Sequence, residues 1–381
     1  MKLFILAGEP SGDRIGADLV ERLRARVTSL ELSGVGGADL TGQGLASMFP
    51  MRELSVMGWR DILPRLPWLH LRAWQVARAI VRNTPDVVVL VDAQIFSAVV
   101  AGHVRRMGGT MPIVLYVAPA VWAWAPGRAT KIKPLFDEVM AVLPFEPRVM
   151  RELGGPTTHY VGHPAVGRLA FRDTAPERGA LLLMPGSRDG ELRRHLPLFR
   201  DAAEAISHHP RVTRLVLPTL PFLADRLRRE VAAWSVPVEV VTGPEARTAA
   251  YAEALAACTS MGTATLELAL SGVPMVGTYV ADAGQEKRWY KYGVKFASLP
   301  NVMLDRMVVP EALFPETGID PAQLSAALNQ VLEPAQSAAQ VAAFGELRSM
   351  MINGLPGDPL EDPAARVLAI VSADRSGRSL A

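Results

Sequence analysis

Short apolar runs alternate with amphipathic stretches along nearly the whole chain, and this alternation is typical of parallel α/β folds. In the first half the apolar runs fall at residues 2–7, 30–35, 86–92, 112–117, 137–143 and 158–162. The stretches between them, such as residues 66–82, carry apolar residues at helical spacing. We therefore predict strands at the apolar runs and helices between them.

The pattern stops once and then starts again. Residues 164–178 combine proline, arginine and aspartate without periodicity, which predicts a linker. Further strands are predicted near 180–184, 213–217, 238–242, 254–259 and 274–279, and three helical stretches follow at about 321–333, 336–352 and 361–373. A chain of 381 residues exceeds one ordinary core. The sequence therefore predicts two Rossmann-like, doubly wound α/β domains with a cleft between them.

Composition excludes several classes of protein. The 40 basic and 38 acidic side chains give a net charge of +2, which argues against general nucleic-acid binding. Cys258, the single cysteine, cannot form an internal disulfide, and this favours a reducing compartment. The apolar opening, residues 1–7, is too short for an export signal, and no run of 18 apolar residues occurs. We expect a cytoplasmic protein.

The first strand is followed by a glycine-rich turn, residues 7–13 (AGEPSGD). In open parallel sheets ligands bind beyond the carboxyl ends of the strands, so Glu9, Ser11 and Asp13 are candidates for a cleft. The turn lacks the glycine spacing of a dinucleotide site. An equally good interpretation is a capped turn in which Asp13 serves the start of a helix.

Two later loops of the first half carry further candidates. Asp92 ends the apolar run at residues 87–92, where a partly desolvated carboxylate can act as a general base; capping the next helix is the alternative. Residues 116–124 (YVAPAVWAW) bring Trp122 and Trp124 into a loop after a strand. Tryptophan faces suit sugars or acyl chains, although one of the two could pack in the core.

In the second half, two strand ends predict a site for an anion. Ser187 and Arg188 follow the strand near 180–184, where a guanidinium suits a phosphate; pairing of Arg188 with Glu191 is the alternative. Gly262 and Thr263 open a short apolar helix whose free N–H groups favour an anion. Glu267, one turn inside that helix, can lean back over its start and accept hydroxyls. The alternative is a solvent-facing glutamate.

Two further polar residues are weaker candidates. Asn301, in residues 298–302 (SLPNV), offers donors and acceptors to a base or a sugar. His163 stands where the two halves join and is as well suited to a structural hinge as to catalysis. His159 and His163 fall on an extended segment, which holds their imidazoles too far apart to share a metal. We therefore expect no metal site.

Taken in order, these segments resemble the lipid-A-disaccharide synthase family, glycosyltransferases with the GT-B fold. The motifs that carry the resemblance are AGEPSGD at 7–13, VMG at 56–58, VWAW at 121–124, LPFE at 143–146, GHP at 162–164, PGSR at 185–188, GTAT at 262–265, GVPM at 272–275, SLPN at 298–301 and VVPE at 308–311. Each motif is short, but so many ordered matches over nearly the whole chain are specific.

The resemblance implies a reaction and its partners. The family transfers 2,3-diacylglucosamine from UDP to the 6-hydroxyl of 2,3-diacylglucosamine 1-phosphate (lipid X), with inversion, and releases UDP. It needs no tightly bound metal and no cofactor. It works on the cytoplasmic face of the inner membrane as a peripheral protein, and the resemblance is compatible with a homodimer. Here residues 63–74, with Trp68 and Trp74, are the candidate apolar surface, with packing in the core as the alternative.

The resemblance also implies a domain plan. Residues 1–165 would bind the acceptor and lipid, with returning helices at about 340–381, and residues 166–339 would bind the UDP-sugar. Asp92 matches the first acid of the family pattern after the third strand, whereas Ile95 and Ser97 stand where a second acid and an asparagine are usual. The competing interpretations are another UDP-sugar enzyme of this fold, such as a 2-epimerase or the peptidoglycan lipid glycosyltransferase, and a non-catalytic binding protein.

Overall fold

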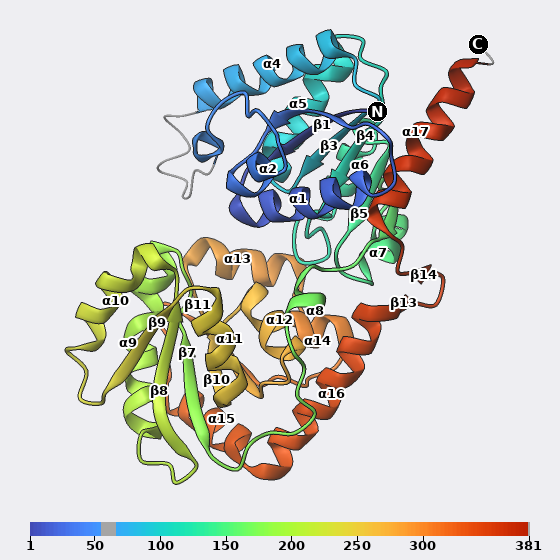
Figure 1. Cartoon of the computed structure of the whole chain (residues 1–381). Coiled ribbons are helices and arrows are strands. Elements are labelled where there is room, and N and C mark those ends of the chain that lie inside the picture. The colour runs from blue at the N-terminus through green and yellow to red at the C-terminus, as the bar shows by residue number, and fades with distance from the viewer. Residues whose placement is uncertain (55–65, 380–381) are drawn as a thin grey trace. The chain divides into compact units, whose positions relative to one another are not determined.

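The computed structural model describes residues 1–54 and 66–379, and the chain divides into two compact units (Figure 1). Unit 1 comprises Met1–Pro164 and Asn353–Ala381, and unit 2 comprises Ala165–Ile352. Each unit is built on a parallel six-stranded sheet with helices between successive strands. The predicted α/β fold with two Rossmann-like halves is confirmed.

Unit 1 has the strand order β2-β1-β3-β4-β5-β6. The strands are β1 (Lys2–Ala7), β2 (Glu31–Val35), β3 (Val87–Val91), β4 (Ile113–Tyr116), β5 (Glu138–Ala141) and β6 (Thr157–Tyr160). The central strands are apolar on both faces because helices cover both faces of a parallel sheet, and every residue of β3 is buried. All six strands predicted for this half are present.

The helices of unit 1 follow the predicted alternation. They are α1 (Pro10–Arg24), α2 (Ala38–Gly42), η1 (Met51–Glu53), α4 (Leu66–Asn83), α5 (Gln94–Arg106), α6 (Arg128–Ile132) and α7 (Glu146–Glu152). The chain returns to this unit at Asn353, and after the short strands β13 (Gly354–Leu355) and β14 (Asp358–Pro359) it forms α17 (Pro363–Ser379).

A cluster of charged side chains fastens this returning segment to the sheet of unit 1. Arg366 on α17 donates to Glu138 on β5 at 2.6 Å, and His159 on β6 lies 2.7 Å from Glu361. Val367 is fully buried. The predicted return of C-terminal helices to the N-terminal domain is therefore confirmed for α17.

Unit 2 has the strand order β12-β11-β10-β7-β8-β9. The strands are β7 (Gly179–Met184), β8 (Val212–Thr219), β9 (Val238–Thr242), β10 (Ala254–Ser260), β11 (Met275–Ala281) and β12 (Glu311–Pro315). No strand was predicted at β12. This edge strand is only five residues long, and prolines at 310 and 315 obscure the alternation of its buried residues, Ala312 and Phe314.

The helices of unit 2 surround this sheet. They are α8 (Ala165–Arg168), α9 (Asp189–Ile206), η3 (Pro221–Leu223), α10 (Ala224–Val231), α11 (Pro244–Glu253), α12 (Thr263–Leu270), α13 (Ala283–Tyr292), α14 (Leu299–Leu304), α15 (Pro321–Leu332) and α16 (Pro334–Asn353). Buried Gln340 of α16 pairs with the backbone of Met275 through bonds of 2.7 and 3.0 Å. Because α16 belongs to unit 2, the return to unit 1 begins at Asn353 and not near residue 340.

Candidate active site

Asp92 lies directly after β3 in a strained turn. Asp92 and Ala93 both have positive φ angles, 53° and 43°, which few residues other than glycine adopt. The Asp92 N–H donates to the Tyr116 carbonyl of the neighbouring β4, and Ser97 Oγ donates to the Asp92 carbonyl, both at 2.8 Å. Burial raises the pKa of the Asp92 carboxyl, although a hydrogen bond from the Ala93 backbone opposes this. The turn therefore fixes a partly desolvated carboxyl at the carboxyl end of β3, a central strand of the sheet.

One glycine of the first loop allows this turn to form, and a second lies in contact with it. A Cβ on Gly8 would lie 2.6 Å from the Cβ of Ala93, closer than real side chains approach. A Cβ on Gly12 would lie 3.5 Å from the Cβ of Asp92. The glycine-rich loop predicted from the sequence and the predicted base thus lie side by side, and at least Gly8 is required there by close packing.

Gln94, the first residue of α5, connects the tryptophan loop (residues 116–124) to the turn at Asp92. Gln94 donates to the Ala118 carbonyl at 3.2 Å and accepts a hydrogen bond from Arg128 at 3.1 Å. The Arg128 guanidinium lies 4.9 Å from the centre of the exposed Trp124 ring, and burial lowers the pKa of Arg128. Gln94 could not be identified from the sequence, because one glutamine after an acid forms no recognisable pattern.

Trp122 is held by a buried acid. Its indole N–H donates to Glu146 Oε1 at 3.4 Å, and its ring meets the ring of Phe145 edge-on. Glu146 also accepts a hydrogen bond from the Leu143 N–H at 3.1 Å. Burial of this carboxyl raises its pKa to about 8, so it carries a proton at neutral pH. Glu146 had been noted only as part of a motif, since burial cannot be read from one sequence.

The three polar residues of the first loop have different surroundings. Asp13 is buried and accepts hydrogen bonds from the N–H groups of Gly37 at 2.7 Å, of Asp39 at 2.8 Å and, at 3.4 Å, of the residue after it. Its carboxylate thus serves the start of α2, which agrees with the alternative of a helix-capping role, although the helix is not the one in which Asp13 lies. A place for Asp13 in the cleft stays a prediction. Glu9 and Ser11 are exposed at the start of α1.

His163 lies half-buried just after β6, near the end of the first segment of unit 1. A role for it in the cleft stays a prediction. His159 instead belongs to the charged cluster that holds α17, with Glu138 at 3.6 Å and Glu361 at 2.7 Å. Over residues 1–54 and 66–379, no group of three or more histidine, cysteine, aspartate or glutamate residues could hold a metal ion.

In unit 2, Arg188 is the N-cap of α9. Its side chain is 70% exposed and donates to Glu191 at 2.8 Å, so the pair considered as the alternative to phosphate binding is present. Such an exposed pair opens at little cost, and the phosphate role of Arg188 and its exposed neighbour Ser187 stays a prediction. A Cβ on Gly186 would lie 3.3 Å from Ser260 Oγ, which places the loops after β7 and β10 side by side.

Gly262 forms the start of α12 in a conformation that only glycine adopts readily, with φ 149° and ψ −158°. Within the described part of the chain, no side chain caps the helix, and apart from the adjoining backbone no atom lies within 4 Å of the position of a Cβ on Gly262. Thr263 is exposed beside it. Thr265 Oγ1 donates to the Gly262 carbonyl at 2.8 Å. The mouth of the helix is therefore open, with unpaired N–H groups that favour an anion.

Glu267 is held from the neighbouring helix α11. Its Oε2 accepts a hydrogen bond from the Tyr251 hydroxyl at 3.2 Å and lies 3.5 Å from an Arg247 nitrogen. The glutamate is thus neither a capping residue nor an ordinary solvent-facing acid. Its predicted contact with a ribose stays a prediction.

Asn301 lies in the interior, and its amide is committed to the protein. Its Oδ1 accepts hydrogen bonds from the N–H groups of Val308 and Val309, both at 2.8 Å, and its Nδ2 donates to the Val309 carbonyl and to Glu311. Glu311 also accepts bonds from the N–H and hydroxyl of Ser298. Asn301 therefore fastens α14 to the segment at residues 308–311. Its contact with a nucleotide stays a prediction.

His195 connects the carboxyl ends of two strands of unit 2, and the sequence alone did not identify it as a candidate. Its Nδ1 donates to the Pro185 carbonyl at 2.7 Å, and its Nε2 accepts from the Val280 N–H at 3.1 Å. Burial lowers the pKa of His195, which keeps the ring neutral for this pair of bonds. Arg194 donates to the Val280 carbonyl at 2.9 Å. The two residues thus fix the end of β7 against the end of β11.

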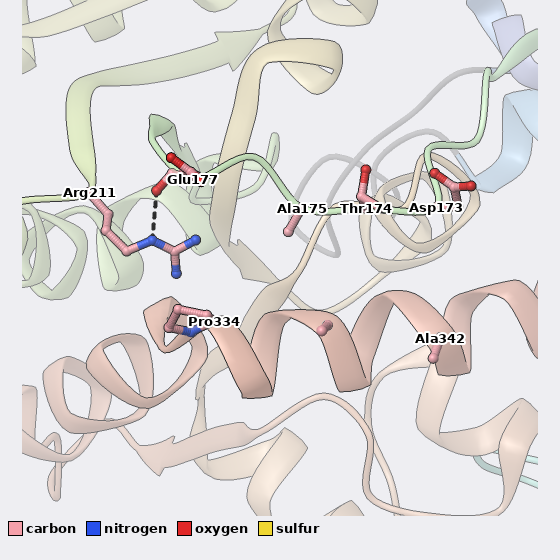
Figure 2. Close-up of a pocket in the computed structure, with 8 residues that line it drawn as sticks. Asp173, Thr174, Ala175, Glu177, Arg211, Pro334 and Ala342 are labelled. Carbon is pink, nitrogen blue, oxygen red and sulfur yellow. Dashed lines mark hydrogen bonds between the residues drawn. The ribbon is translucent and has the colours of Figure 1, made fainter.

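A cavity of about 540 Å³ lies elsewhere in unit 2, between the linker and α16 (Figure 2). It is lined by Asp173, Glu177, Arg211 and Ala342 among others. The Arg211 guanidinium donates to the carbonyls of Glu177, Pro176 and Leu332. Arg211 immediately precedes β8, so the cavity lies by the amino ends of the strands of unit 2, whereas the candidate loops of unit 2 lie at their carboxyl ends. The Arg211 guanidinium is already bonded to backbone carbonyls.

The candidate apolar surface lies partly on α4, whereas residues 63–65 fall outside the described residues. Ala73, Val76, Ala77 and Ile80 bury one face of α4. Leu66, Trp68, Leu71 and Trp74 are each at least 40% exposed. Trp68, Leu71 and Trp74 repeat every three residues and so form a stripe on the helix. Among the helices described, none is long and apolar enough to cross a membrane.

The comparisons with known proteins agree with the motifs. A family model described as lipid-A-disaccharide synthetase matches residues 3–348. The lipid-A-disaccharide synthase of Nitrobacter winogradskyi is 39% identical over 366 residues, 93% of this chain and 91% of that protein. That of Rhodospirillum centenum is 37% identical over 395 residues, 99% of this chain and 97% of that protein.

Solved structures support the fold alone. The glycotransferase of kitacinnamycin superposes with a TM-score of 0.58 at 16% identity, covering 97% of this chain and 98% of that one. The predicted GT-B architecture is thus confirmed, as is the resemblance stated from the motifs. Since a family model and near-complete relatives match along almost the whole length, the chain belongs to the lipid-A-disaccharide synthase family of glycosyltransferases.

Proposed function

We propose that the chain transfers 2,3-diacylglucosamine from UDP to the 6-hydroxyl of 2,3-diacylglucosamine 1-phosphate. The products are the β-1,6-linked lipid A disaccharide 1-phosphate and UDP, and the anomeric centre is inverted. Family membership supports the choice of substrates. The observation that carries the mechanism is the desolvated Asp92 carboxyl, fixed by a strained turn at the end of β3.

Asp92 is the proposed general base. As the sugar 6-oxygen bonds to the anomeric carbon, its proton passes to the Asp92 carboxylate, and the bond from that carbon to the UDP oxygen breaks. Burial raises the pKa of Asp92 and so makes it a better proton acceptor. Asp13 is less suited, because its carboxylate already accepts bonds from backbone N–H groups of α2.

The donor is proposed to bind in unit 2. The open mouth of α12 at Gly262 and Thr263 would receive the diphosphate, and its N–H groups would stabilise the charge that builds on departing UDP. Arg188 would exchange Glu191 for a phosphate oxygen. Glu267 would accept the ribose hydroxyls. No step requires a metal ion in this scheme.

The exposed face of α4 is proposed to rest on the cytoplasmic face of the inner membrane, where both lipid substrates reside. Trp68 and Trp74 suit the boundary between headgroups and acyl chains, since each ring is amphipathic. Arg78 lies over the Trp74 ring at 5.3 Å and would contact anionic headgroups. Arg72 lies over the Trp68 ring at 4.4 Å but is paired with Glu53 at 2.7 Å, so it supports the ring and is not offered to a headgroup. The protein would thus be peripheral.

Asp92→Asn in the full-length chain tests the assignment of the base. Asparagine also tolerates a positive φ, so the turn is retained while the proton acceptor is lost. We expect turnover to fall about a hundredfold or more, with the dissociation constant for UDP within twofold of wild type. Glu9→Gln is the matched control in the adjacent loop. Wild-type turnover in Asp92→Asn together with an inactive Glu9→Gln would move the base to the first loop.

A further inference from the structure

Two residues of α11 hold the carboxylate of Glu267 from one side. Tyr251 and Arg247 are four residues apart, so they lie on the same face of the helix. Both act on Oε2 of Glu267, at 3.2 Å and 3.5 Å respectively. Among the residues that the structure describes, Oε1 has no hydrogen-bond donor. Oε2 is thus bonded to the protein, whereas Oε1 can accept hydrogen bonds from a ligand.

The Tyr251 side chain is a rigid donor. The residue is 2% exposed, so its ring cannot change position without opening the packing beneath α11. Burial and, secondly, the charge of Glu267 raise the pKa of the Tyr251 hydroxyl, which therefore keeps its proton. A hydroxyl that stays protonated donates to Glu267 at every physiological pH. Arg247 adds a weaker attraction, because it is partly exposed and lies farther away.

An unsupported glutamate side chain at a helix surface samples many rotamers, and a ligand that needs one of them must bear the entropy of selecting it. Fixing Oε2 removes most of that freedom before a ligand arrives. The carboxylate then presents Oε1 and the remaining lone pairs in one direction. A vicinal diol, which donates two hydrogen bonds from adjacent carbons, fits such a receptor.

We propose that Tyr251 and Arg247 are positioning residues that pre-organise Glu267 as a receptor for the ribose diol of the nucleotide donor. The inference rests on the proposed function, which places the nucleotide at the start of α12. It adds that preference for a ribonucleotide over a 2′-deoxyribonucleotide depends on α11, although no residue of α11 is proposed to touch the ligand.

The test is calorimetric titration of the full-length chain with UDP and with 2′-deoxy-UDP. Tyr251→Phe removes only the hydroxyl and keeps the buried ring, so the fold should be retained. We expect UDP to bind about tenfold more weakly to this variant, because one hydrogen bond to a charged group is lost. Binding of 2′-deoxy-UDP should stay within about twofold of wild type, since that ligand lacks half of the diol. Tyr290→Phe, at an 81% exposed tyrosine of α13, is the matched control and should change neither constant.

A double variant distinguishes an effect of Tyr251 on the position of Glu267 from a general disturbance of the fold. If Tyr251 acts through Glu267, Tyr251→Phe should add nothing to the loss caused by Glu267→Gln, and the two losses should not sum. Equal weakening of both ligands, an unchanged preference for UDP over 2′-deoxy-UDP, or additive losses would each overturn the inference. Failure of the wild-type chain to bind UDP would instead refute the proposed donor site, which is a distinguishable result.

Discussion

Replacing Glu146 by glutamine asks whether unit 1 carries a buried proton beneath the tryptophan loop. The Glu146 side chain contacts the Trp122 indole and the Leu143 N–H, and burial raises its pKa from an ordinary 4.5 to about 8. The folded chain therefore binds this proton more tightly than the unfolded chain does. The resulting stability is fully present below about pH 4.5 and is lost as the pH rises through about 8.

The size of the effect follows from the two pKa values. Each pKa unit corresponds to about 1.4 kcal/mol. For a carboxyl with pKa 4.5 in the unfolded chain and about 8 in the folded chain, linkage gives a loss of about 2.5 kcal/mol between pH 6 and pH 9. Glutamine resembles the protonated carboxyl in shape and does not titrate, so Glu146→Gln should lack this part of the pH dependence.

Calorimetric unfolding at pH 6 and pH 9 measures the difference directly. Wild type should lose about 2.5 kcal/mol more than Glu146→Gln over this interval. Glu152→Gln, at the exposed far end of the same helix α7, is the matched control and should follow wild type. If wild type and Glu146→Gln lose equal stability between the two pH values, Glu146 is ionised in the folded chain and the reasoning from burial is wrong.

Three further predictions concern the other sites. Gly262→Ala should lower the free energy of unfolding by about 1–3 kcal/mol, because alanine is strained at this φ, and should also weaken UDP binding. Gly167→Ala, at an open position without a positive φ, is the control and should change neither the unfolding nor the UDP titration. Asn301→Ala should lower the free energy of unfolding by about 2–4 kcal/mol, because buried backbone N–H groups lose their acceptor. A variant that keeps wild-type stability yet cannot bind UDP would indicate that Asn301 contacts the nucleotide directly. Replacing Trp68 and Trp74 together by serine should reduce co-sedimentation with vesicles of anionic phospholipid without changing UDP affinity. Unchanged co-sedimentation would refute the proposed contact of α4 with the membrane.

The sheets were predictable because burial on both faces leaves a direct trace in the sequence. The run at Val87–Val91 is apolar at every position, as a central parallel strand requires. Glu311–Pro315 was not predictable, since an edge strand of five residues bounded by prolines resembles a loop. The limits of the returning segment also depend on tertiary packing, because α16 and α17 have similar helical patterns but belong to different units.

The local setting of a candidate residue was predictable where it follows from the neighbouring sequence. Asp92 ends an apolar run and Gly262 opens a helix, and both positions could be inferred from their neighbours. The partners of Asp13 lie 24 and 26 residues away, and those of Asn301 on a later segment, so neither commitment could be read locally. A polar side chain in a short motif can thus bind the backbone as readily as a ligand, and only the fold distinguishes the two.

The central claim is tested most directly by the product that the purified chain forms. The full-length protein would be incubated with UDP-2,3-diacylglucosamine and 2,3-diacylglucosamine 1-phosphate, and the lipids analysed by mass spectrometry while released UDP is quantified. We predict a disaccharide 1-phosphate with a β-1,6 linkage, formed in equal amount to UDP and lost in Asp92→Asn. UDP released without disaccharide, or disaccharide formed at the wild-type rate by Asp92→Asn, would contradict the account.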